Sequence, residues 1–133
     1  MKVIVPCDAI ETKKATLAAA EILGPVYLRF SREKTPVFTT EETPFEIGKA
    51  EIFWESKQSK IAIIACGPVL YNALIAAKEL EEEGIGTIVV NNHTIKPMDE
   101  ERIIDFARRT GAVVTVEDHQ IAGGMGSAVA EVL

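Results

Sequence analysis

Short, continuous apolar runs alternate in this chain with segments whose apolar residues recur at helical spacing, and this alternation constrains the fold most. Residues 61–65, 87–90 and 112–116 form such runs, which are typical of strands covered on both faces. The segments between them repeat apolar residues every three or four positions, as at Leu70 and Ala73. Strands that alternate with helices favour a parallel sheet between helices. We therefore predict an α/β fold in three layers, α/β/α.

The first part of the chain repeats this pattern on a smaller scale. Residues 2–6 and 26–31 are predicted strands, and Asp8 followed by Glu11 is a capping-box pattern that opens a helix between them. Residues 32–46 are rich in Thr, Pro and Glu, which predicts a surface linker. The predicted organisation is an N-terminal strand-helix-strand remnant over residues 1–35, a linker over 36–46 and a main domain over 47–133.

A helix is expected between the second and third apolar runs of the main domain. Asp99 is its predicted N-cap, and Gly111 is its predicted end. Ile103, Ile104 and Ala107 fall on one side of this helix. We predict that this side faces the sheet.

The last expected helix opens at the glycines before Met125. Its apolar stripe comprises Met125, Ala128, Val129 and Val132. The chain stops at Leu133 without a Gly, Asn or basic residue to close the helix, which suggests a domain truncated inside this element. A bare apolar stripe and an unpaired edge strand both recruit further copies, so we expect self-association.

Charge and cysteine usage exclude several classes of partner and site. The 133 residues carry a formal net charge of -6 and no long basic run, which argues against binding to nucleic acid or to a membrane surface. No stretch approaches the roughly 18 to 20 apolar residues that span a bilayer. Cys7 and Cys66 lack zinc-site spacing and are predicted to be buried, reduced thiols. We expect a cytoplasmic protein.

Ligands of an open α/β sheet bind at the carboxyl ends of its strands, which directs attention to four loops. These loops contain Ser31-Arg32 and residues 66–68, 91–93 and 117–119. Asp118 and His119 suggest an acid-base pair, but adjacent side chains on an extended segment diverge and no activated nucleophile accompanies them. We favour a structural role for this pair, and likewise for His93.

Residues 123–127, Gly-Gly-Met-Gly-Ser, follow a strand and open a helix. The free amides of such a turn could hold an anion. No lysine follows as in a Walker loop, however, and the three-glycine dinucleotide spacing is absent. We therefore favour tight turning and close helix-sheet packing as the reason for these glycines.

Two arginines near the end of the second strand differ from the other candidates. Because side chains alternate along a strand, Arg29 and Arg32 point to opposite faces. Arg32 lies at the strand exit, with only Glu33 as a local partner. Its planar guanidinium suits a phosphate ester. From chemistry alone, a phosphate contact and a surface arginine over the linker are equally good interpretations.

Several segments, taken in order, resemble transketolases. Residues 24–32, Gly-Pro-Val-Tyr-Leu-Arg-Phe-Ser-Arg, are similar to the end of the family's pyrimidine-binding domain. Further similarity to split C-terminal transketolase subunits lies at residues 45–50, 65–67, 94–99, 116–119 and 123–133. Deoxyxylulose-phosphate synthases and ketoacid dehydrogenase β-subunits share the glycine-rich ending, but the ordered combination favours transketolase.

The resemblance implies part of an enzyme that transfers a two-carbon ketol unit between sugar phosphates. It implies thiamine diphosphate and a divalent cation held between two subunits, with catalytic, cofactor and metal contacts in sequence preceding Met1, on an N-terminal subunit or segment. Arg32 is implied to bind the substrate phosphate, although Glu33 and Lys34 depart from the family's Ser-Arg-Gln-Asn-like segment. A mostly parallel mixed sheet is also implied, with residues 47–54 as its antiparallel strand, in a domain that supports dimerisation.

Two further functions stay open. The chain could be a stand-alone α/β module that binds a small anion or nucleotide through its loops, or an assembly domain without a ligand. Isothermal titration with sugar phosphates, thiamine diphosphate and nucleotides separates the first from the transketolase interpretation. Sedimentation with and without an N-terminal partner addresses the second.

Overall fold

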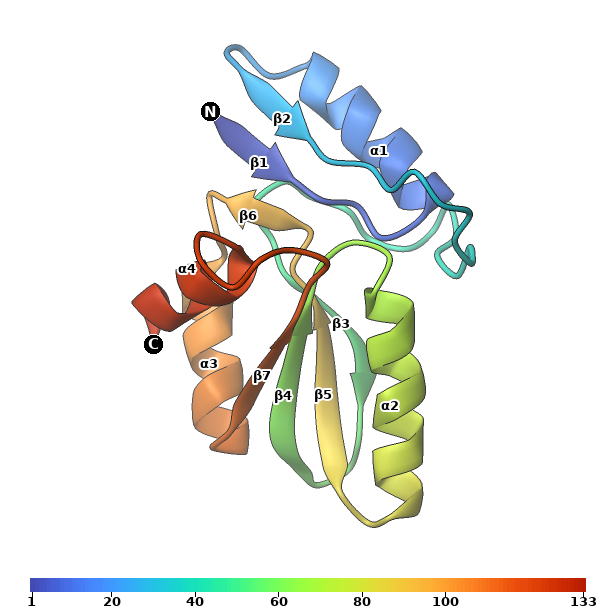
Figure 1. Cartoon of the computed structure of the whole chain (residues 1–133), viewed down its shortest axis with the longest axis vertical. Coiled ribbons are helices and arrows are strands. Elements are labelled where there is room, and N and C mark those ends of the chain that lie inside the picture. Colours follow the sequence, from blue (N-terminus) through green and yellow to red (C-terminus); the bar gives the residue numbers. More distant parts are fainter.

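A four-stranded sheet forms the centre of the main domain, in the strand order β3-β5-β4-β7 (Figure 1). The computed structural model describes residues 1–133. β4 (Ser59–Ala65), β5 (Gly86–Asn91) and β7 (Val113–Val116) are parallel, and β3 (Glu51–Glu55) runs antiparallel to β5 at one edge. The predicted mixed, mostly parallel sheet is confirmed. Its antiparallel strand begins at Glu51 rather than at residue 47, because residues 47 and 48 form a turn.

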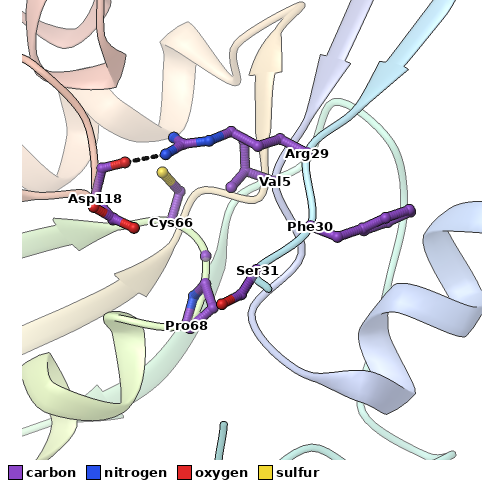
Figure 2. A pocket seen from close by; sticks show the side chains of 8 residues that line it. Val5, Arg29, Phe30, Ser31, Cys66, Pro68 and Asp118 are labelled. Carbon is purple, nitrogen blue, oxygen red and sulfur yellow. Dashed lines mark hydrogen bonds between the residues drawn. The ribbon is translucent and has the colours of Figure 1, made fainter. Parts of the chain in front are cut away.

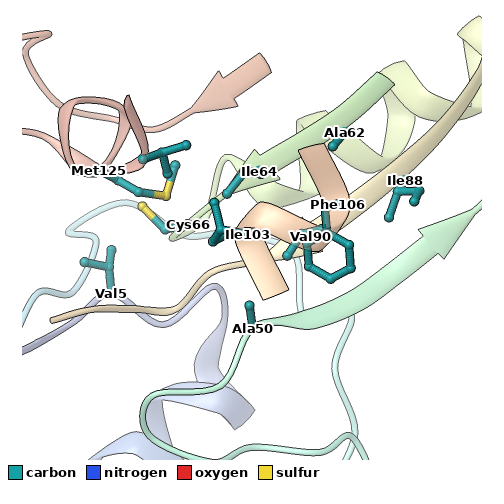
Figure 3. Packing of buried hydrophobic residues seen from close by; sticks show 11 residues of the cluster. Val5, Ala50, Ala62, Ile64, Cys66, Ile88, Val90, Ile103, Phe106 and Met125 are labelled. Atoms are coloured by element: carbon teal, nitrogen blue, oxygen red, sulfur yellow. The ribbon is translucent and has the colours of Figure 1, made fainter. Parts of the chain in front are cut away.

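Helices cover both faces of this sheet, so the three-layer prediction is confirmed (Figure 1). α2 (Leu70–Glu82) lies on one face, and α3 (Glu100–Thr110) and α4 (Met125–Val132) lie on the other. The core beneath α3 and α4 includes Ile64, Ile88, Ile103, Phe106 and Met125 (Figure 3). The core beneath α2 includes Ile63, Leu70, Ala73, Ala77 and Val89. Neighbouring strand residues enter opposite cores, which is why the strands are continuous apolar runs.

The N-terminal unit forms a second, smaller sheet with the order β2-β1-β6. β1 (Lys2–Ile4) pairs in parallel with β2 (Val26–Leu28), and α1 (Ala9–Ala20) connects them. The third strand, β6 (Thr94–Lys96), comes from the main domain and pairs antiparallel with β1. Its three residues are too few to show an alternating pattern, so the sequence did not predict it. This strand makes the two units share one sheet.

The face of α3 that enters the core differs by one position from the predicted side. Ile103 is buried as expected, but its partner in the core is Phe106. Ile104 and Ala107 are only half-buried. They border a groove between α3 and the end of α4. The prediction missed Phe106 because it centred the buried stripe on Ile104 and Ala107. Those two residues face the groove beside α4 rather than the sheet.

The apolar stripe of α4 is not bare, which corrects one of the two reasons given for self-association; the other, an edge strand, is present in β7. Met125 and Val129 are buried in the core, and Val132 packs at its border. Among the large apolar side chains of α4 and the chain end, only Leu133 is exposed. The sheet and α3 therefore already cover the surface that the sequence predicted to be exposed.

Asp99 precedes α3 as predicted, but its carboxylate does not cap that helix. Its Oδ2 atom instead accepts a hydrogen bond of 3.0 Å from the amide of Ala50. Gly111 ends the helix as expected, in a left-handed conformation with φ of 78°. Asp99 thus ties the start of α3 to the segment that leads into β3.

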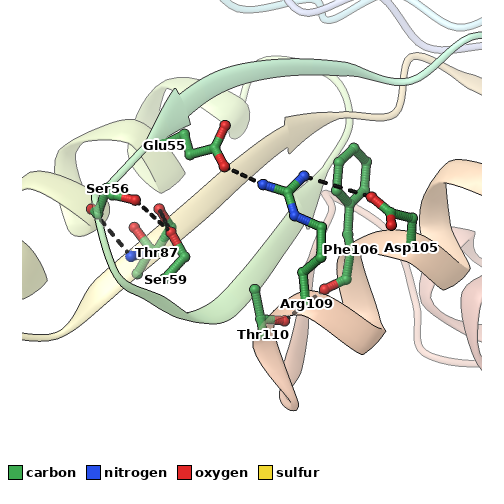
Figure 4. A network of polar contacts seen from close by, with 8 residues as sticks. All are labelled: Glu55, Ser56, Ser59, Thr87, Asp105, Phe106, Arg109 and Thr110. Carbon is green, nitrogen blue, oxygen red and sulfur yellow. Dashed lines mark hydrogen bonds and ion pairs between the residues drawn. The ribbon is translucent and has the colours of Figure 1, made fainter.

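Polar contacts close the amino-terminal end of β4 and β5 (Figure 4). The Ser59 hydroxyl donates to the carbonyls of Ser56 and Thr87, each at 3.0 Å. Arg109 on α3 forms ion pairs with Glu55 on β3 and with Asp105 on its own helix. These contacts hold this end of the sheet together. The loops at its other end face the N-terminal unit (Figure 1).

Candidate functional site

Arg32 lies in an exposed loop, four positions beyond the end of β2 at Leu28. The predicted strand over residues 26–31 is shorter in the structure, so Arg32 does not stand at the strand exit itself. None of the ion pairs or side-chain hydrogen bonds of the chain involves it. The hydroxyl of Ser31 accepts a hydrogen bond of 3.2 Å from the amide of Glu33, which forms a turn around Arg32. The side chain of Glu33 is not paired with Arg32. The guanidinium is therefore available for a ligand.

Arg29 has a different environment. Figure 2 shows its guanidinium reaching across to the backbone carbonyl of Asp118, close to Val5 and Cys66. Phe30, the next residue, points away toward α1. Arg29 therefore links the N-terminal unit to the loop after β7 and is not free for a substrate.

Asp8 anchors the segment that follows the Arg32 loop. The side chain is 3% exposed. Its Oδ1 atom accepts hydrogen bonds from the amide of Glu11 at 2.9 Å and from the hydroxyl of Thr39 at 2.7 Å. Its Oδ2 atom accepts from the amides of Phe38 at 2.9 Å and of Thr39 at 2.7 Å. Burial by itself would raise the pKa of Asp8, but these hydrogen bonds outweigh it and hold the pKa below its usual range.

Glu11 completes a buried polar cluster with Asp8. Its carboxylate accepts hydrogen bonds of 2.6 Å from the amide of Cys7 and 2.6 Å from the side-chain amide of Asn91 at the end of β5. Burial raises the pKa of Glu11, despite these donors. The predicted capping box is present in a shifted form, because Glu11 reaches the amide of Cys7 rather than that of Asp8. The contact with Asn91 was not predicted, since the two residues lie in different units.

The glycine-rich turn before α4 already holds an anion from the chain itself. The carboxylate of Glu117 accepts hydrogen bonds of 2.8 Å from the amides of both Met125 and Gly126. A Cβ atom at Gly124 would overlap this carboxylate. The glycines therefore serve close packing, as predicted, and the amides that could hold a phosphate are occupied.

The Asp118-His119 pair does not form an acid-base site. Asp118 uses its backbone carbonyl to accept from Arg29, and Nδ1 of His119 contacts the carbonyl of Gln120 at 2.9 Å. These contacts support the predicted structural role of both residues.

Cys7 and Cys66 are buried and free, as predicted. Burial raises the pKa of the Cys66 thiol to about 12.

His93 is fully buried at the junction of the two sheets. Its ring stacks on Phe45 with 4.4 Å between the ring centroids, and its Nδ1 atom lies 2.9 Å from the hydroxyl of Thr94. Its Nε2 atom has no hydrogen-bond partner. Burial lowers the pKa of His93 to about 4, so the ring is neutral near pH 7. This supports the predicted structural role.

Nowhere do three or more His, Cys, Asp or Glu side chains come together in a way that could hold a metal ion. None of the four helices combines the length and apolar character needed to cross a membrane.

A family model described as the transketolase C-terminal domain matches residues 48–133. The chain belongs to the transketolase family. A 6-deoxy-6-sulfo-D-fructose transketolase subunit from Clostridium sp. (strain MSTE9) is 41% identical over 133 residues, which is 100% of this chain and 41% of the relative. A 1-deoxy-D-xylulose-5-phosphate synthase from Desulfitobacterium hafniense is 42% identical over 130 residues, 96% of this chain and 20% of the relative.

The fold agrees with a solved transketolase structure described as a split gene transketolase in an inactive β4 tetramer. The TM-score is 0.94 at 45% sequence identity, over 100% of this chain and 44% of the solved chain. The chain thus spans less than half the length of each of these transketolase relatives. The similarity runs through both units, so the small N-terminal sheet is part of the transketolase fold and not an addition to it.

Within this transketolase fold, Arg32 as a phosphate contact stays a prediction, and the sequence did not reveal the groups that fix its surroundings. Asp8 was recognised only as a helix cap, because its bonds to Phe38 and Thr39 bridge 30 and 31 positions. One pattern in the sequence could have revealed the hydrogen bonds between Glu117 and the turn before α4. Glycines at 124 and 126 follow a carboxylate at the end of a buried strand, and that carboxylate can turn back to the free amides.

We predict that Glu117→Ala lowers the free energy of unfolding by about 1.5 to 3 kcal/mol, because it removes a charged acceptor from two backbone amides. Asp118→Ala is the matched control, since it keeps the carbonyl that binds Arg29 and removes an exposed carboxylate. Urea titrations of both variants measure the difference. Equal stabilities of the two variants would contradict the role assigned to Glu117.

We also predict that acidification destabilises the chain through His93. The unfolded state binds a proton near pH 6.5, whereas the folded state resists it down to about pH 4. Stability should therefore fall as the pH drops through this window, by up to about 1.4 kcal/mol per pH unit. His93→Phe keeps a ring against Phe45 and should flatten the slope between pH 7 and 5, measured by urea titration at each pH. An unchanged slope would exclude His93 as its source.

Proposed function

We propose that this chain is the C-terminal part of a thiamine-diphosphate-dependent transketolase that acts together with an N-terminal subunit or segment. The observation that carries the proposal is the similarity, over the whole of this chain, to a transketolase subunit at 41% identity and to a split gene transketolase at 45% identity. In both cases the chain covers less than half of the relative. The complete enzyme would be a transferase that moves a two-carbon ketol unit between sugar phosphates.

Arg32 is proposed to bind the phosphate of the substrate. It follows a strand at the carboxyl edge of the small sheet, is exposed, and has no carboxylate partner in the chain. A guanidinium offers two parallel N–H donors that match two oxygens of a tetrahedral anion. The proposed contribution of this chain to the reaction is therefore binding and orientation of the substrate's charged end.

The cofactor and its divalent cation are proposed to bind mainly to the N-terminal partner. The residues of this chain do not fit a diphosphate-metal site, because no three ligand side chains converge and Glu117 occupies the amides of the α4 turn. Thiamine diphosphate, when bound, supplies the carbanion chemistry of the transfer. We assign no step of that chemistry to residues of this chain.

The domain organisation is proposed to follow the predicted boundaries. The N-terminal unit, residues 1–35, would be the end of a pyrimidine-binding domain, residues 36–46 a linker, and residues 47–133 the C-terminal domain. The complete enzyme would work in the cytoplasm. Assembly with further copies of the chain is also proposed, on the basis of the tetramer named for the solved relative.

Two related activities compete with this proposal. The 42% identity to a 1-deoxy-D-xylulose-5-phosphate synthase supports a synthase of that type. The 41% identity to a 6-deoxy-6-sulfo-D-fructose transketolase subunit supports a substrate whose anionic group is a sulfonate. Arg32 suits either tetrahedral anion. Assays of the reconstituted enzyme with phosphate-bearing and sulfonate-bearing ketoses, and with pyruvate as an alternative donor, discriminate among the three.

We predict that the isolated chain transfers no ketol unit and binds no thiamine diphosphate, and that both activities appear after addition of its N-terminal partner. Isothermal titration of the chain alone and a coupled assay of the mixture measure this. Cofactor binding by the isolated chain in the low micromolar range, about -8 kcal/mol, would contradict the proposal.

In the complete enzyme, Arg32→Ala should weaken the binding of phosphorylated substrates by about 1.5 to 3 kcal/mol, the usual loss for a hydrogen bond to a charged group. Substrates without the phosphate should be affected little. Lys57→Ala, in the turn between β3 and β4 at the far end of the sheet, is a control that removes one exposed positive charge. If Arg32→Ala weakens both substrate types equally, Arg32 has a structural role instead.

A further inference from the structure

The loop that carries Arg32 is held at both of its ends. At its start, the amide of Arg29 donates to the carbonyl of Ile4 at 3.0 Å, and the guanidinium of Arg29 donates to Asp118. At its end, the amides of Phe38 and Thr39 donate to Asp8. Between these anchors, Arg32 contacts no hydrogen-bonding partner of its own. The direction of its side chain therefore depends on how the backbone between the anchors is placed.

Asp8 is the only side chain that joins residues 38 and 39 to the start of α1 through buried hydrogen bonds. An ionised carboxylate has about four sites for donors, and Asp8 fills them with one donor from α1 and three from residues 38 and 39. Lys13 and Lys14 also bind the linker from α1, but they contact residues 40 to 43, farther from Arg32. The pair of Lys13 and Glu41 is 62% exposed at each side chain.

The same carboxylate borders a hollow beneath the loop. This hollow has a volume of about 540 Å³, and its walls include Asp8 and Thr12 from the start of α1 and Ser31, Glu33 and Lys34 from the loop. Phe30, whose ring points toward α1, also borders this hollow but does not fill it. A loop that spans such a space keeps its position through its anchors rather than through packing beneath it.

We infer that Asp8 is a positioning residue for the phosphate contact of Arg32. The inference rests on the proposed function of Arg32. Asp8 holds residues 38 and 39 against the start of α1, and this fixes the path of the loop and the direction in which Arg32 presents its guanidinium. Loss of the anchor should misplace Arg32 without removing it, so it should affect phosphate-bearing substrates and spare the others.

The decisive variant is Asp8→Asn, which keeps the size of the side chain but turns an NH2 group toward backbone amides. Two measurements are made. Hydrogen exchange of the 133-residue chain, followed by NMR, should show exchange at the amides of Phe38 and Thr39 at least about tenfold faster than in the native chain. In enzyme reconstituted with the N-terminal partner, KM for a phosphorylated aldose acceptor should rise roughly tenfold, equivalent to about 1.4 kcal/mol. KM for the same aldose without phosphate, and kcat for both, should stay unchanged.

Lys13→Ala is the matched control, because it removes an exposed contact between the same helix and the linker and should change neither measurement. Thr39→Val is the milder variant if Asp8→Asn does not fold. It removes only the hydroxyl donor to Asp8, and should raise the same KM in the same direction by a smaller factor.

The outcomes separate the two proposals. If exchange at Phe38 and Thr39 is unchanged in the variants, Asp8 does not anchor the loop and the inference is wrong. If exchange accelerates while KM for the phosphorylated aldose changes only in Arg32→Ala, the positioning role is wrong and the proposed function stands. If Arg32→Ala leaves that KM unchanged, the role of Arg32 fails and the inference fails with it.

Discussion

The backbone of Val5 is the contact on which the arrangement of the two units depends. Its amide donates to the carbonyl of His93 at 2.7 Å, and its carbonyl accepts from the amide of Gly67 at 3.1 Å. Val5 is itself part of the main hydrophobic core. Buried backbone groups that lose a partner cost about 1 to 3 kcal/mol each, so the units cannot slide along this seam without a large penalty. The pairing of β1 with β6 and the reach of Arg29 to the loop after β7 extend the same restraint.

Backbone and side-chain amides, rather than cations, neutralise the buried carboxylates of this chain. Asp8 and Glu11, which are buried, and Glu117, which is half-buried, each accept bonds from N–H groups, and none of them forms an ion pair. The ion pairs of Arg102 and Arg109 lie near the outer surface of the main domain, with partners on β3 or α3. Arg32 takes part in none of the ion pairs, although acidic residues outnumber basic ones in the chain.

Whether the sequence predicts an interaction depends on how far apart its two partners lie along the chain. The strands at residues 61–65 and 87–90 and their helices were predicted because each forms a core layer whose pattern is local. Arg32 could be singled out because the sequence predicts a strand that ends just before it, although β2 ends at Leu28. The bonds of Asp8 to residue 39 and of Glu11 to Asn91 could not be predicted, because the partners come together only after the sheets have formed. β6 was missed for the same reason, since three residues become a strand only beside β1.

The shared sheet also bears on how force and motion pass through the protein. The linker joins the two units covalently, but β6 crosses back to β1, so the connection in sequence and the connection in space do not coincide. A hinge needs a seam with few contacts, whereas this seam contains a strand pair, the backbone bonds of Val5 and a buried carboxylate. A hinge motion between the two units would therefore break all of these contacts. A displacement imposed on the outer helices α3 or α4 would be carried to the small sheet, and with it to the loop beyond β2.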